Sequence, residues 1–156
     1  MNIRRSIDYN SIFTALNVLM AEKLPQMKLY YEIGKLVSAR PEKGAAVAAA
    51  EYLAKAYPGI SGFSPRNLRR MREFYRTYEH TPETLVAAMA IGWTQNIVIL
   101  ENCKTADERA WYISAVRRFR WSKAELLRKI AKGKNDTPAQ DNPHKKLSLD
   151  NADELC

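Results

Sequence analysis

The sequence marks the start of one helix, near the middle of the chain, with unusual clarity. Ser64 is a residue type whose hydroxyl caps the free backbone N–H groups of a first helical turn. Pro65 follows at the first helical position, where its missing N–H costs nothing and its fixed φ suits a helix. Phe63 before the cap and Leu68 after it have the spacing of a hydrophobic staple. We therefore predict a helix over residues 65–78.

The predicted helix has an apolar face and an opposite arginine face. A solvent-exposed surface is the ordinary explanation of such a charged face. The alternative is a nucleic-acid contact, because arginine presents a rigid fork of donors that matches phosphate oxygens and the guanine edge. One acid, Glu73, accompanies five arginines between residues 64 and 78, and an evenly mixed surface would carry more. The N-terminal residues of a recognition helix typically reach the bases. The candidate contact residues here are Arg66, Asn67, Arg69, Arg70 and Arg76.

The segment before this helix predicts a partner for it. Residues 45–57 are rich in alanine, which has the best helix propensity and lets helices approach closely. Residues 57–62 form a turn rich in proline and glycine. Together with residues 65–78 they predict a helix-turn-helix-like unit, whose turn is longer than the usual three to four residues.

Helical patterns cover most of the remaining chain. We expect helices over residues 8–23 and 27–39, and one that Pro82 begins. Another is expected from Thr94 through the apolar run 97–100, and capping boxes at Thr105 and Ser122 predict two more, the last ending at Gly133. The predicted class is all-α: a compact multi-helix domain over residues 1–132, followed by a polar tail over residues 133–156 that we expect to be disordered.

The composition of the chain bears on its location and on the ligands that it could bind. The chain has 156 residues and is 46% hydrophobic, which is enough for a core. It has no apolar run near the length of a membrane span and no signal-peptide pattern, so we expect a cytoplasmic protein with no membrane partner. Two cysteines and two histidines show no disulfide framework or metal-ligand spacing, so we expect no metal and no cofactor. Cys103 is expected to be a small helix-end residue rather than a nucleophile, and the three tryptophans are expected in the core.

The net charge of +8 belongs to the helical part. Residues 1–132 hold 22 Lys and Arg against 12 Asp and Glu, whereas residues 133–156 hold 3 against 5. Such an excess indicates a polyanion partner. A second basic cluster holds seven cations against Glu125 alone, namely Arg117, Arg118, Arg120, Lys123, Arg128, Lys129 and Lys132. The second set of candidate contacts is its first four members, Arg117, Arg118, Arg120 and Lys123. The helix dipole accounts for three of these cations near a helix end, but it does not account for Lys123 at a helix start.

Several blocks of the sequence resemble the helical N-terminal domain of YhcG-type bacterial proteins. The most specific block is Pro-Gly-Ile-Ser-Gly-Phe-Ser at residues 58–64. The other matching blocks are residues 29–34, 65–68, 70–75, 93–96, 108–109 and 121–122, so that the resemblance covers most of residues 27–132. It implies a DNA-binding module of the helix-turn-helix type, which in that family usually precedes a PD-(D/E)xK nuclease domain.

The sequence also departs from that family. The residues after Gly133 are too few for a nuclease fold, Gln95 stands where the family often has histidine, and Pro25 and the alanine run replace more mixed sequence. We therefore expect a non-catalytic DNA-binding module, with DNA or RNA as its partner. The alternative is a protein-interaction module of a phage or mobile element, which inhibits or assists a defence nuclease in the manner of an anti-CRISPR protein.

Overall fold

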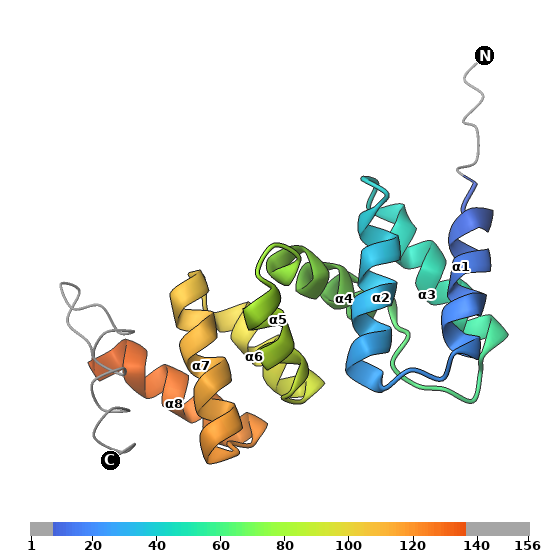
Figure 1. Cartoon of the computed structure of the whole chain (residues 1–156). Coiled ribbons are helices and arrows are strands. Elements are labelled where there is room, and N and C mark those ends of the chain that lie inside the picture. The colour runs from blue at the N-terminus through green and yellow to red at the C-terminus, as the bar shows by residue number, and fades with distance from the viewer. Residues whose placement is uncertain (1–7, 137–156) are drawn as a thin grey trace. The chain divides into compact units, whose positions relative to one another are not determined.

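Every regular element is an α-helix in the computed structural model, which describes residues 8–136 (Figure 1). The eight helices there are α1 (Asn10–Ala21), α2 (Gln26–Ser38), α3 (Gly44–Ala56), α4 (Pro65–Tyr78), α5 (Pro82–Met89), α6 (Trp93–Asn102), α7 (Ala106–Phe119) and α8 (Lys123–Asp136). The predicted all-α class is confirmed. The helices form two compact units, α1 to α4 ending at His80 and α5 to α8 beginning at Thr81. The sequence did not predict this division.

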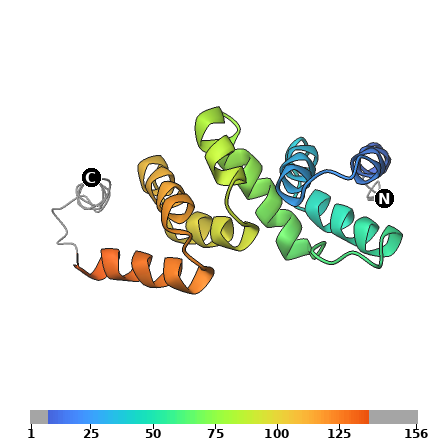
Figure 2. The same cartoon turned by 60° about the horizontal axis from the view of Figure 1, so that its bottom comes forward.

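The first unit is built around the pair of α2 and α4, which lie against each other in both views (Figures 1 and 2). Ile33 and Val37 of α2, and Met71 and Phe74 of α4, are fully buried. Gly34 lets the two backbones meet: a Cβ there would lie 2.7 Å from the carbonyl carbon of Met71 and closer still to its oxygen. The two helices therefore pack more closely than any side chain at position 34 would allow.

The alanine-rich helix α3 packs on α4, as the sequence predicts. Four of its alanines are buried, namely Ala45, Ala46, Ala49 and Ala50. On its other side α3 meets α1, where the rings of Phe13 and Tyr52 stack with centroids 4.3 Å apart. The hydroxyls of Tyr52 and Tyr57 each donate to Asn17 Oδ1 at 2.9 Å. Helix α3, the link over residues 57–64 and helix α4 thus form the expected helix-turn-helix-like unit with a long turn.

The second unit has its own core, to which α6, α7 and α8 contribute Ile99, Ile113 and Leu126. Asn96 is fully buried, and its Nδ2 donates to the carbonyls of Ala88 at 2.8 Å and Gly92 at 3.0 Å, so it ties the end of α5 to α6. The apolar run 97–100 is helical, as predicted.

Two predicted helix ends in this unit are wrong. Helix α6 begins at Trp93 with Gly92 at its N-cap, and not after Thr94. Helix α8 runs through Gly133 to Asp136, because one glycine in a helix costs only about 1 kcal/mol and does not by itself end it. The predicted tail therefore starts within a helix, and from residue 137 on it lies outside the described residues. Within residues 8–136, no helix is both long and apolar enough to cross a bilayer.

Candidate nucleic-acid interface

Helix α4 begins as its sequence predicts. The Ser64 hydroxyl accepts from the backbone N–H of Asn67 at 3.1 Å, and Pro65 is the first helical residue. Phe63 and Leu68 are both buried, which agrees with the predicted staple. Gly62, with φ +99°, supplies a left-handed turn just before the cap. The start of α4 is thus fixed by a cap, a proline and two core residues.

The arginines of α4 lie on the side away from the core. Arg66, Arg69 and Arg76 are exposed, Arg70 is half-buried, and Leu68, Met71, Phe74 and Tyr78 are buried. Within residues 8–136 neither Arg66 nor Arg69 forms an ion pair. The Arg76 Nε donates to Ser38 Oγ at 2.9 Å, so Arg76 is tethered to the end of α2. The structure therefore gathers four predicted arginines on one side of one helix.

Asn67, the fifth candidate on α4, differs from the arginines. It is half-buried, and its Nδ2 donates to the Gly62 carbonyl at 2.6 Å. This bond closes the turn that precedes α4, so the side-chain amide serves the helix start. The periodicity of the sequence placed Asn67 at an N-terminal position of the helix, but periodicity cannot reveal a bond to a neighbouring loop.

Arg72 lies at the border between the apolar and the arginine side of α4 and adds to the charge of this surface. It is half-buried, and its pKa is lowered from the usual arginine value, first by burial and then by the charges of Arg76 and Arg69. Glu73 opposes this effect to a smaller extent. The charges of Arg76 and Arg69 thus disfavour the positive charge of Arg72, and a bound anion would relieve that repulsion. Sequence reasoning left Arg72 out because it considered the outward face alone.

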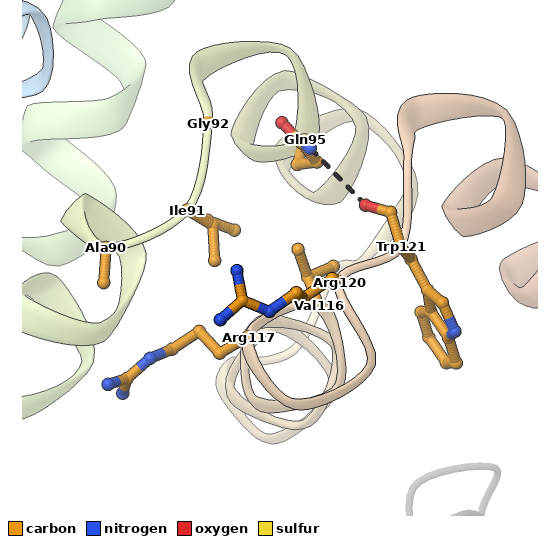
Figure 3. A pocket seen from close by; sticks show the side chains of 8 residues that line it. All are labelled: Ala90, Ile91, Gly92, Gln95, Val116, Arg117, Arg120 and Trp121. Carbon is orange, nitrogen blue, oxygen red and sulfur yellow. Dashed lines mark hydrogen bonds between the residues drawn. The ribbon is translucent and has the colours of Figure 1, made fainter.

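The second predicted cluster lies in the second unit, where α7 ends and α8 begins. Arg117, Arg118, Arg120 and Lys123 are all exposed. Two of them, Arg117 and Arg120, line an open pocket of about 380 Å³ that the sequence did not predict (Figure 3). Arg118 and Lys123 do not line it. Of these four candidate contacts, two are therefore pocket arginines and two are cations nearby in sequence.

Aromatic side chains accompany this cluster. Trp93 is buried as predicted, whereas Trp111 and Trp121 are only half-buried. Trp121 stacks on Phe119 with ring centroids 5.5 Å apart, and the Lys129 ammonium lies 5.5 Å from the Trp121 ring centroid. The sequence predicted the basic residues here but not the partial exposure of Trp111 and Trp121, because helical spacing alone indicated core positions for all three tryptophans.

Among the described residues no three His, Cys, Asp or Glu side chains come together as a metal site would require. Cys103 is 2% exposed and follows the last residue of α6, so it is the helix-end residue that the sequence predicts.

Comparison with known proteins identifies the family. The family model described as the DUF1016 N-terminal domain matches residues 14–135, which confirms the resemblance to the YhcG-type N-terminal domain. No curated protein and no solved structure gives a match. Because the matched residues span α1 to α8 and make up most of the chain, the protein belongs to the DUF1016 N-terminal domain family.

Proposed function

We propose that this chain is a cytoplasmic DNA-binding module that contacts duplex DNA through the arginine side of α4. The observation that carries the proposal is the placement of Arg66 and Arg69, which are exposed, lie opposite the buried residues of α4 and form no ion pair within residues 8–136. Arg76 and Arg72 extend the same positive surface.

The position of these arginines along the helix supports the same function. Arg66 is the second residue of α4 and Arg69 lies one turn further. The first turn of a helix carries the positive end of its dipole and attracts phosphate oxygens. In helix-turn-helix proteins the recognition helix places its first residues against the bases and the backbone of the major groove. Helix α4 is the second helix of its helix-turn-helix-like unit, and this is the position of a recognition helix.

The proposal assigns this chain binding and no catalysis. Arginine and backbone N–H groups can hold phosphates but supply no general base or nucleophile. The resemblance to domains that usually precede a nuclease supports a module that brings a catalytic partner to DNA. Asn67 is left out of the contact set because its amide already bonds to Gly62.

The test compares two charge-matched double variants in duplex binding by fluorescence anisotropy. Arg66→Ala/Arg69→Ala removes two cations from α4, and Lys35→Ala/Lys55→Ala removes two exposed cations from α2 and α3. We expect the α4 variant to bind duplex at least about tenfold more weakly than the control variant, since a hydrogen bond to a charged group contributes about 1.5–3 kcal/mol. Equal affinities would remove α4 from the interface. If the wild-type chain binds neither DNA nor RNA at low salt, the partner is a protein, and the anti-CRISPR-like alternative replaces this proposal.

A further inference from the structure

The pocket of the second unit has a floor that is apolar and a rim that is basic. Ile91 and Val116 are buried and form part of its wall, while Arg117 and Arg120 are exposed at its edge. Figure 3 shows the Arg120 guanidinium turned toward Ile91, with the Arg117 side chain extending toward the Ala90 side of the pocket. The pocket thus offers an apolar surface and two cations to one ligand.

Positive charge converges here without an acid to balance it. No Asp or Glu lines the pocket, and within residues 8–136 neither Arg117 nor Arg120 forms an ion pair. Gly92, the N-cap of α6, lines the pocket too, and the first turn of α6 contains no acidic residue. Two arginines and the N-cap residue of α6 therefore line the same space, which favours an anion, and phosphate above all.

Arg120 occupies a backbone conformation that glycine would adopt more easily. It follows α7 with φ 54° and ψ 42°, the left-handed cap at which helices usually place glycine. An arginine in this conformation makes the protein less stable than a glycine would. Residues held in such conformations cluster at functional sites. Lys23 also has a positive φ, 52°, but it does not line this pocket.

The size of the pocket indicates more than a lone phosphate ion. Its volume of about 380 Å³ lies in the range of sites for small organic ligands, which are typically ~300–1,000 Å³. A phosphate held by the arginines would leave the apolar wall of Ile91 and Val116 to the organic part of the ligand. Gln95 is already fixed, since its Nε2 donates to the Trp121 carbonyl at 3.4 Å (Figure 3).

We propose that this pocket binds the phosphate end of a nucleotide, with the phosphate on Arg117 and Arg120. The nucleotide comes either from the 5′ end of a nucleic-acid strand or from free mononucleotide. The inference takes its ligand class from the proposed function, but it assigns a separate site in the other unit of the chain. It can therefore stand or fall independently of the α4 surface.

The test uses Arg120→Gly in the full chain. Glycine suits the left-handed conformation, so this variant should melt no lower than the wild type while losing the guanidinium. Lys23→Gly is the matched control, because it removes the same charge at another residue with a positive φ, one that does not line the pocket. Lys104→Gln is the second control, because Lys104 is an exposed cation of the same unit that does not line the pocket.

The probes are one single-stranded oligonucleotide with a 5′-phosphate, the same strand with a 5′-hydroxyl, and adenosine 5′-monophosphate. We expect Arg120→Gly to weaken binding of the 5′-phosphorylated strand or of the mononucleotide by about tenfold or more, and both controls to change it by less than about twofold. Preference for the phosphorylated strand identifies a strand end as the source, and binding of the mononucleotide alone identifies a free nucleotide.

The outcomes separate the two proposals. Equal losses in Arg120→Gly, Lys23→Gly and Lys104→Gln, or no loss in any of them, would overturn the pocket site, even where duplex binding through α4 persists. Arg120-dependent binding of adenosine 5′-monophosphate by a chain that binds no duplex would support the pocket and overturn the α4 interface.

Discussion

Gly34 is the residue on which the packing of the first unit depends most directly. Any Cβ at this position overlaps the Met71 carbonyl, and both residues belong to helices that are held by buried side chains. Relief would require α2 and α4 to move apart along their whole contact. The buried side of α4 that packs on α2 determines which way its arginines face. A substitution at Gly34 would therefore also disturb the candidate interface on the opposite side of α4.

Gly34→Ala should therefore destabilise the protein by about 3 kcal/mol, the upper part of the usual range for overpacking, despite the better helix propensity of alanine. Gly59→Ala is the control, because a Cβ there meets nothing within 4 Å. It should change stability by less than about 0.5 kcal/mol. Urea unfolding of both variants measures the difference, and similar values for the two would show that α2 and α4 can separate at little cost.

Tyr112 makes stability depend on pH in the alkaline range. It is 5% exposed, and burial, followed by the charges of Cys103 and Glu108, raises its pKa to about 12. Below pH 10 the phenol is protonated in both the folded and the unfolded chain. Between about pH 10 and 12 the unfolded chain loses the proton while the folded chain keeps it, so rising pH favours unfolding.

Raising the pH from 9 to 11 should thus lower the unfolding free energy of the wild type by about 1 kcal/mol more than that of Tyr112→Phe. The variant lacks the phenol, so this position has no proton to lose. Urea melts of both proteins at the two pH values give this difference directly. Identical pH dependence in the two proteins would mean that Tyr112 ionises freely in the folded state.

At the scale of the element, α4 is defined at its N-terminus by two separable interactions. The Ser64 hydroxyl accepts from the Asn67 N–H, and Phe63 is 5% exposed. Ser64→Ala should cost about 1 kcal/mol through loss of the cap, and Phe63→Ala on the order of 3 kcal/mol through loss of a buried ring. Denaturant unfolding of the two variants measures both losses of stability. Equally small effects would show that the helix start does not depend on this cap and staple.

Elements with strong local signals were predictable from the sequence, and elements whose bounds depend on tertiary contacts were not. Ser64 with Pro65 and the Thr105 capping box predicted the starts of α4 and α7, because a cap is a local interaction. Thr94 failed as a cap because Asn96 reaches back to Ala88 and Gly92 and starts α6 earlier. The prediction that Gly133 ends α8 was wrong because a single glycine does not by itself end a helix.

The candidate sites likewise were predictable where the signal is local and not where it depends on tertiary contacts. Arginine periodicity predicted the α4 surface, since exposure on a helix follows from the position of its apolar residues. The pocket could not be predicted, because it joins the link between α5 and α6 to the end of α7, which lies about 25 residues further along the chain. The left-handed conformation of Arg120 could not be predicted either, since arginine is not a residue type that marks such a turn.

At the scale of the whole molecule, the chain carries two basic surfaces, one in each compact unit. The first is the arginine side of α4, and the second surrounds the pocket at the end of α7. Each is supported by a core of its own unit, so a variant at one surface leaves the core of the other intact. The contributions of the two surfaces to nucleic-acid binding should therefore be separately measurable.

The most direct test of the central claim is the salt dependence of duplex binding. Each phosphate contact releases counterions, so the slope of log K against log salt grows by about 0.9 for each contact. Fluorescence anisotropy over a series of salt concentrations should give a slope for Arg66→Ala/Arg69→Ala that is smaller than the wild-type slope by about 2 units. Lys35→Ala/Lys55→Ala should keep the wild-type slope. The same slope and the same affinity in the wild type and in Arg66→Ala/Arg69→Ala would contradict the claim that α4 binds DNA.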